Sequence, residues 1–113
     1  MAEYEVHILY RGQILFEVTA KDEDAAIAAG EGEFMHSPLA HEADEWNTIA
    51  LITLPDGKYT ATVSFSGKNI YITESDNVED AKEKGLALFC EKSNCFPYVN
   101  KHEVSSVRVL EKR

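Results

Sequence analysis

The 113-residue sequence contains few cysteines and no long apolar run. Its two cysteines are too few for a disulfide scaffold in a chain of this length, which favours a reducing compartment. No apolar segment approaches the roughly 20 residues of a membrane-spanning helix, and the N-terminal MAEYEVHILY lacks the layout of a signal peptide. We therefore expect a single cytoplasmic domain, residues 1–113, without a membrane partner.

Basic residues are scarce. The chain has 11 Lys plus Arg against 20 Asp plus Glu, for a formal net charge of -9. Proteins that bind nucleic acids or anionic membranes directly need clustered Lys and Arg, so we exclude both partners. The 44% of hydrophobic residues is typical of a globular chain and not of a disordered one.

Known catalytic motifs are also missing. No Gly-x-Ser-x-Gly elbow and no Asp-x-Asp-x-Asp-Gly calcium loop occurs, and the Gly-Glu-Gly at 30–32 ends a predicted helix instead of starting one at a phosphate. A nucleophile and base could come from Cys90 or Cys95 with His102, but no spacing supports that pair. We expect a protein that is not an enzyme and has no cofactor; a small Cys/His enzyme is the weakest alternative.

What the sequence does contain is a repeated pattern. Residues 4–10 read YEVHILY and residues 59–65 read YTATVSF, and both alternate with the period of a strand. Gly12 and Gly67 follow, 55 residues apart, and are interpreted as hairpin turns. The next predicted strands, ILFEVT and IYITES, correspond at an offset of 56.

Two predicted helices come next, and both begin with the triplet Glu-Asp-Ala, at 23–25 and at 79–81. Acidic residues in the first turn suit the positive end of a helix dipole. The expected N-caps are Asp22 for the first helix and Asp76 or Asn77 for the second.

A further apolar strand closes each unit, at 47–54 and at 103–110, and the aperiodic segment 35–46 is the best loop candidate. The sequence therefore predicts an α+β fold of two β-β-α-β repeats, repeat 1 over 1–58 and repeat 2 over 59–113. Together they would form an antiparallel sheet of about six strands with two helices packed on one face. The alternative is an ordinary α+β meander with evenly spaced elements.

The negative charge lies in one half of the chain. Repeat 1 holds 12 acidic and 3 basic residues, whereas repeat 2 holds 8 of each. This asymmetry favours a non-catalytic protein-interaction module that docks on a basic protein. In size and charge it is similar to the small acidic inhibitors of phages and mobile elements, some of which mimic nucleic acid and block a nucleic-acid-binding protein. The alternative is an acidic surface that only maintains solubility.

The candidate partner-binding residues are the acids of repeat 1 together with one tryptophan, which is either a binding anchor or a core residue. They are Asp22, Glu23, Asp24, Glu31, Glu33, Glu42, Asp44, Glu45 and Trp46.

A ligand-binding domain is the second hypothesis. His36 and His41 in one loop, and Cys90 and Cys95 at the equivalent place, would form a Cys₂His₂ zinc site if the fold brought them together. A Cys90–Cys95 disulfide and two inert thiols are the other interpretations, and we expect no metal.

Such a domain could be a homodimer that pairs through the edges IYITES or SSVRVL, although Lys68 and Arg108 could protect them. A small-ligand cleft would be lined by Tyr10, Phe16, Tyr59 and Tyr71.

Overall fold

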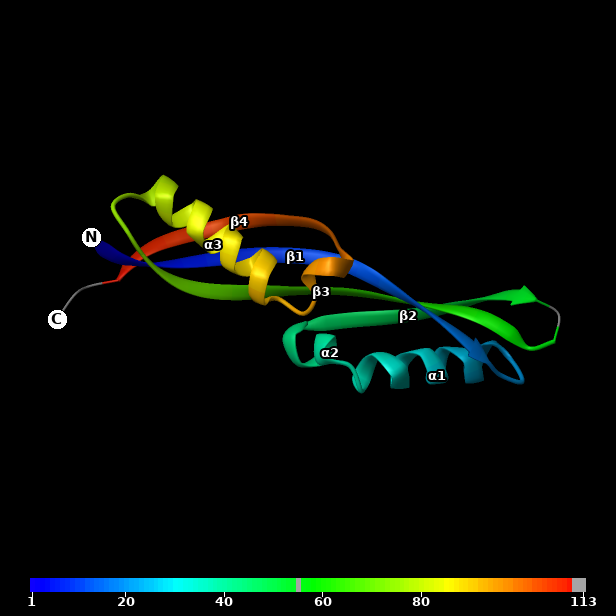
Figure 1. Ribbon diagram of the computed structural model, residues 1–113. Coiled ribbons are helices and arrows are strands. Elements are labelled where there is room, and N and C mark those ends of the chain that lie inside the picture. Colours follow the sequence, from blue (N-terminus) through cyan, green and yellow to red (C-terminus); the bar gives the residue numbers. More distant parts are fainter. Residues whose placement is uncertain (55, 111–113) are drawn as a thin grey trace.

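The computed structural model describes residues 1–54 and 56–110. Its strands form one antiparallel sheet in the order β2-β3-β1-β4 (Figure 1). Two strands of 18 residues lie at the centre and two shorter strands flank them. The strands are β1 (Ala2–Thr19), β2 (Glu45–Leu54), β3 (Lys58–Ser75) and β4 (Val99–Leu110).

Three α-helices and one 3₁₀ turn connect the strands. The helices are α1 (Glu23–Met35), α2 (Pro38–Glu42) and α3 (Val78–Lys92), and the turn is η1 (Phe96–Tyr98). The connectivity, apart from α2 and η1, is that of a split β-α-β arrangement, which by itself carries no function. None of the described helices is long and apolar enough to cross a membrane.

The expected sheet of about six strands with two helices is wrong. Among the described residues the sheet has four strands and three α-helices accompany it. Each predicted hairpin is one continuous strand, since β1 and β3 pair without a register shift from Ala2 opposite Ser75 to Thr19 opposite Lys58. The unit of the chain is therefore β-α-β and not β-β-α-β.

The two glycines that were interpreted as turns instead permit close approach within the strands. A Cβ atom on Gly12 would lie 2.1 Å from the carbonyl oxygen of Tyr98, and one on Gly67 would lie 2.5 Å from the hydroxyl oxygen of Tyr10. Neither glycine has a positive φ; among the described residues only Gly57 does, in the turn before β3. The backbone therefore stays extended at both glycines.

The predicted loop 35–46 is also partly wrong, because α2 lies inside it and β2 already begins at Glu45. Ser37 precedes this helix and Pro38 occupies its first turn, where the missing amide hydrogen of proline is tolerated. This start signal was readable in the sequence, but the segment has too few residues to show helical periodicity.

The two halves correspond at an offset of 55 in both strands and helices. Helix α1 is capped by Asp22 and α3 by Asn77, and each cap side chain accepts a hydrogen bond of 2.8 Å from a backbone amide. Arg11 lies opposite Ser66, its own equivalent, so an approximate two-fold axis passes through this pair. The offset of 56 inferred for the second strands and for the Glu-Asp-Ala triplets is out of register by one residue. The buried helix residues that do correspond are Ala26 with Ala81, Gly30 with Gly85, and Phe34 with Phe89.

Both long helices pack closely on the same face of the sheet. A Cβ atom on Gly30 would lie 2.3 Å from the Cβ of Ala61, and one on Gly85 would lie 2.6 Å from Cγ1 of Val6. Val6 and Ala61 are themselves 55 residues apart, and both are fully buried. Each helix therefore rests on the central strand of the other half.

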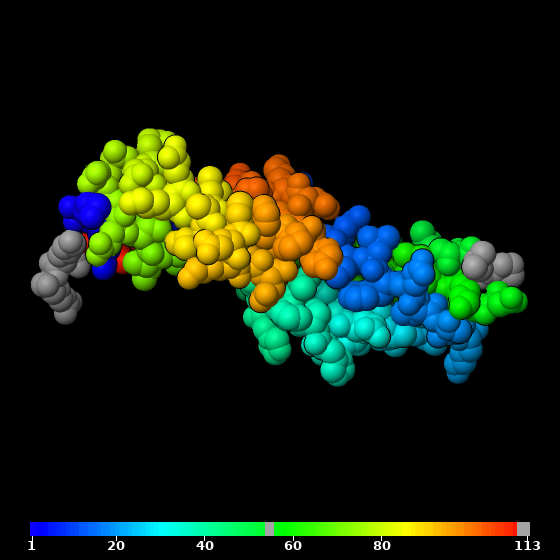
Figure 2. All heavy atoms as spheres, in the orientation of Figure 1, coloured from blue at the N-terminus to red at the C-terminus, as the bar shows by residue number. Residues whose placement is uncertain are grey.

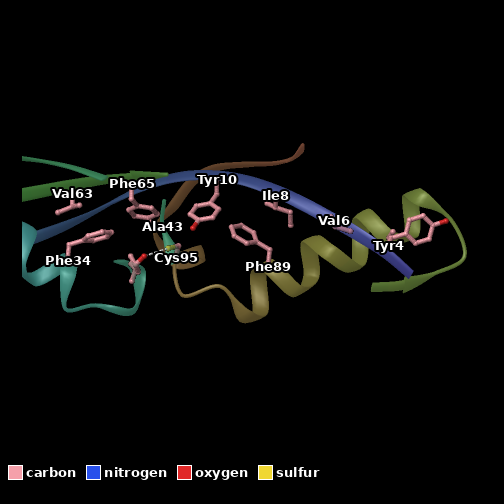
Figure 3. Packing of buried hydrophobic residues seen from close by; sticks show 12 residues of the cluster. Tyr4, Val6, Ile8, Tyr10, Phe34, Ala43, Val63, Phe65, Phe89 and Cys95 are labelled. Carbon is pink, nitrogen blue, oxygen red and sulfur yellow. Dashed lines mark hydrogen bonds between the residues drawn. The ribbon is translucent and has the colours of Figure 1, made fainter. Parts of the chain in front are cut away.

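The main core lies between the sheet and the helices (Figure 3). Phe34 packs against Phe65 and Trp46, with ring centroids 5.9 and 5.3 Å apart. Phe89 packs in the same way against Tyr10 and His102, at 5.5 and 5.3 Å. A second, smaller cluster is centred on three alanines beneath the first turns of α1. Its buried members are Ala26, Ala50 and Ala61.

The molecule is elongated, with principal extents of 61 × 21 × 18 Å (Figure 2). Its radius of gyration over Cα atoms is 18.0 Å, whereas a compact chain of this length would have about 13 Å. Helices α1 and α3 lie toward opposite ends of the sheet (Figure 1). No helix of residues 1–54 and 56–110 covers the other face of the sheet. This face exposes several large apolar side chains, namely Leu15, Ile49, Leu51, Ile70 and Ile72.

Candidate functional site

The predicted acidic residues fall into a group with structural contacts and a group that is free on the surface of α1. Asp22 belongs to the first group, since its side chain caps α1 by accepting from the amide of Ala25 at 2.8 Å. Glu23 and Asp24 lie in the first turn, where the helix dipole favours negative charge. Both are exposed, as is Glu33, while Glu31 is partly buried.

Glu42 connects the two halves of the protein. Its carboxylate accepts hydrogen bonds from the Ser93 hydroxyl and from the backbone amides of Asn94 and Cys95, at 3.0 and 3.4 Å for the amides. Burial acts to raise the pKa of Glu42, but these donors outweigh it and leave the pKa below its ordinary value. Glu42 is thus a structural residue, and reversing its charge would disturb the fold.

Asp44 and Glu45 lie where β2 begins, near the middle of the long axis of the molecule. The Asp44 carboxylate accepts from the amide of Lys68 at 3.1 Å, and the Asp44 amide donates to the carbonyl of Ser66 at 2.9 Å. Asp44 therefore closes the end of the β2–β3 ladder. Glu45 is exposed and lies opposite Ser66 in that ladder.

Trp46 is a half-buried residue that packs against the main core. Its ring lies on Phe34, which supports the interpretation as a core residue over that of a free binding anchor. The acids and Trp46 do not converge on one site. Helix α2 ends and β2 begins near the middle of the molecule, whereas the first turn of α1 lies toward one end (Figure 1).

The acids of α1 lack the ion pairs that the two first-turn acids of α3 make. In α3, Lys82 pairs with Glu79 at 3.5 Å and Lys84 pairs with Asp80 at 3.2 Å. The positions of α1 that correspond to these two lysines hold Ile27 and an alanine, and no ion pair among the described residues involves α1. Between its acids α1 exposes small and apolar side chains, those of Ala28, Ala29 and Met35.

Histidines and cysteines do not form a metal site in the part of the chain that is described, where no group of three potential ligands occurs. Both cysteines are free, so the predicted disulfide alternative is not formed. Cys95 is buried, and burial raises the pKa of its thiol to about 12. A thiol with this pKa stays protonated at neutral pH and is a poor nucleophile. His36 instead contacts the carbonyl of Gly32 through Nδ1 at 2.7 Å.

The aromatic residues expected around a ligand cleft are packed into the cores. Tyr10 is buried, and Phe16 and Tyr71 pack against the main cluster. Tyr59 packs against the alanine cluster. This arrangement counts against a small-ligand cleft at these rings.

Two hollows lie near the middle of the molecule and are related by the approximate two-fold axis. The larger, of about 500 Å³, includes Leu9 with Lys68 and Glu103 opposite it on either side. The smaller, of about 410 Å³, includes Ser64, with Gln13 and Asn47 in the same two places. The equivalent positions are thus charged in one hollow and neutral in the other.

The charges of the larger hollow balance, so it does not favour an ion of one sign. The sequence did not predict this hollow. Its lining residues come from all four strands, so they can be recognised as neighbours only when the strand order is known. The ionised groups are those of Arg11, Lys68, Lys101, Asp44, Glu45 and Glu103.

Comparison with protein-family models finds no match to this chain, and neither do searches of curated proteins and of solved structures.

Proposed function

We propose that the protein is a non-catalytic interaction module that docks on a basic protein through the α1 surface. This surface is defined here by Asp24, Ala28, Glu31, Glu33 and Met35. The observation that carries the proposal is the contrast between two equivalent helices. Glu79 and Asp80 in the first turn of α3 have lysine partners at 3.5 and 3.2 Å, whereas no acid of α1 has a partner among the described residues. Helix α1 also places exposed apolar side chains between its acids.

This contrast weighs against a role in solubility alone. A solubilising surface gains nothing from exposing Met35, which is 54% exposed, beside unpaired carboxylates. A docking surface uses both, because apolar contact supplies affinity and complementary charge supplies orientation and rate of association. The partner that fits presents apolar side chains flanked by Lys or Arg.

The test compares capture by two variants that each lose three charges. The first is Asp24→Asn with Glu31→Gln and Glu33→Gln on α1, and the matched control is Glu79→Gln with Glu83→Gln and Glu91→Gln on α3. None of these side chains makes a hydrogen bond that holds the fold, apart from the surface pair of Glu79 with Lys82. Asp22, Glu42 and Asp44 are left unchanged because of their structural contacts.

Immobilised protein is used to capture basic proteins from a cell extract, and the affinity for the captured protein is then measured. We expect the α1 variant to bind roughly 3- to 100-fold more weakly, since each of the three exposed pairs contributes about 0.2–1 kcal/mol. The α3 variant should bind as the unmodified protein does. Binding should weaken between 0.1 and 1 M salt, where the Debye length falls from about 10 to about 3 Å. Equal binding by both variants, or capture that salt does not change, would contradict the proposal.

A further inference from the structure

The central strand β3 has a free edge over half of its length. Strand β2 begins opposite Ser66, so among the described residues the segment 67–75 pairs only with β1. We call this segment the β3 free edge. It is nine residues long and ends where the chain turns toward α3.

Three hydrogen bonds show which backbone groups of β3 point outward. The carbonyl of Ser66 accepts from Asp44, the amide of Lys68 donates to the Asp44 carboxylate, and the carbonyl of Glu74 accepts from Lys84 Nζ at 2.6 Å. The outward groups thus belong to even-numbered residues, as expected in an antiparallel ladder. Ile70 and Ile72 lie between these capped ends.

The backbone groups of Ile70 and Ile72 on this side have no partner among the described residues. Their side chains lie on the helix-free face and are 52% and 60% exposed. A bare edge with apolar side chains is a template for a further strand, which proteins usually block.

We propose that the β3 free edge pairs with the same edge of a second copy of this chain, joining two sheets into one of eight strands. The antiparallel register is centred on Tyr71, and the new backbone hydrogen bonds form at Ile70 and Ile72, between the ends that Asp44 and Lys84 already cap. It places Lys68 opposite Glu74 of the second copy and Ile70 opposite Ile72. In this register outward-pointing residues meet outward-pointing residues, so the backbone groups of both isoleucines are paired.

The register is selected by these side chains. A shift of two residues in one direction sets Lys68 opposite Ile72, and a shift in the other direction sets Ile70 opposite Glu74. Only the full overlap pairs unlike charges and apolar side chains together, and cross-strand pairs of these kinds stabilise a sheet. The contact is two-fold symmetric and closes on itself, so it ends at a dimer.

The equivalent edge of β1 supplies a control within the same molecule. Strand β4 covers β1 only as far as Gly12, so within the described part of the chain residues 13–19 pair only with β3. Self-pairing of this segment over its full length would set Leu15 opposite Glu17, an apolar residue against an unpaired charge. The two edges have the same geometry, but only the β3 free edge is complementary to itself.

The test uses charge reversal at the two ends of the β3 free edge. Lys68→Glu would place two acidic residues opposite each other in the dimer, and Glu74→Lys would place two basic residues opposite each other. Each variant alone should dimerise at least tenfold more weakly in sedimentation equilibrium. An equimolar mixture of the two should form a heterodimer, because every opposed pair then carries unlike charges; native mass spectrometry identifies it by its mass. Circular dichroism checks that both variants are folded.

Glu17→Lys on the β1 edge is the matched control and should leave the dimer unchanged. A monomeric protein across a dilution series that reaches millimolar concentration would overturn the proposal. So would a dimer that both single reversals leave intact, or folded variants whose mixture does not form a heterodimer. The α1 surface lies on the other half of the molecule, so these results do not depend on docking to a basic protein.

Discussion

At the scale of single residues, Glu42 shows how one carboxylate can hold distant segments together. It lies at the end of α2 and binds the loop after α3, more than 50 residues away in sequence. The three donors around its carboxylate make the ionised form the stable one in the folded protein. The sequence analysis assigned Glu42 to a partner surface. Its true contacts come from the other half of the chain, so no neighbouring residue in the sequence indicates them.

The lowered pKa of Glu42 sets the sign of a pH dependence. A carboxyl group whose pKa is lower in the folded protein stabilises it at pH values above the ordinary pKa of 4.5. This stabilisation is lost as the pH falls through the lowered pKa. We expect Glu42→Gln to reduce the free energy of unfolding by about 1–2 kcal/mol at pH 7. The difference from the unmodified protein should shrink in acid, as measured by urea denaturation across pH.

Glu33→Gln is the control for this measurement. Glu33 is exposed on α1 and takes part in no ion pair among the described residues. We expect a change within about 0.5 kcal/mol at neutral pH. An equal effect of both substitutions would show that charge alone, and not the Glu42 contacts, determines the stability.

At the scale of secondary-structure elements, the two glycines of α1 have opposite roles. Gly30 lies against Ala61, where an added methyl group has no space, while a Cβ atom on Gly32 would meet no other atom within 4 Å. The packing of α1 on the sheet therefore requires Gly30, whereas Gly32 only weakens the helix.

Alanine substitution should therefore move the stability in two directions. Gly30→Ala should destabilise the protein by about 1–3 kcal/mol, because the helix must shift away from β3. Gly32→Ala should stabilise it by about 0.5–1 kcal/mol, because alanine loses less backbone entropy in a helix. Thermal denaturation of both variants checks the pair, and a shift of the same sign in both would contradict this packing of α1.

The elements also show how far the sequence could predict the fold. The alternation at 4–10 and 59–65 identified strands, and the caps Asp22 and Asn77 are confirmed, because both signals are local. The interpretation of Gly12 and Gly67 as turns was wrong, because a glycine marks either a turn or a close contact and only the tertiary structure distinguishes the two. For the site, the exposed acids of α1 were predictable, and IYITES was identified as a possible pairing edge. The extent of the β3 free edge, residues 67–75, was not predictable because it depends on where β2 begins.

At the scale of the whole molecule, the two ends of the sheet have unequal cores. Tyr4, Val6 and Ile8 fill the core toward the α3 end of the sheet (Figure 3), whereas the end beneath the first turns of α1 is filled by the cluster of three alanines. Smaller side chains bury less apolar area, so less hydrophobic free energy holds the alanine end together.

We expect this end to open at a lower free energy than the rest of the protein. In native-state hydrogen exchange, the amides around Ala50 and Ala61 should exchange faster than those around Val6 and Ile8. The comparison is made within the unmodified protein. A variant such as Ala50→Val is not a suitable control, because the alanine cluster has no space for a larger side chain. Equal protection at both ends would show that the sheet unfolds as one unit.

The strand order also has a consequence for how the chain folds. Strand β1 pairs with β3 over 18 positions, and Glu3 finally pairs with Leu110, so the ladder of β4 joins almost the first residue to almost the last described one. Neither half can complete its own sheet before the other half has been synthesised. Such distant pairing loses chain entropy on closing large loops before the strand contacts stabilise the protein. Folding is therefore slower than in helical proteins of the same size. The first half must therefore wait, with its long strand uncovered, for the second.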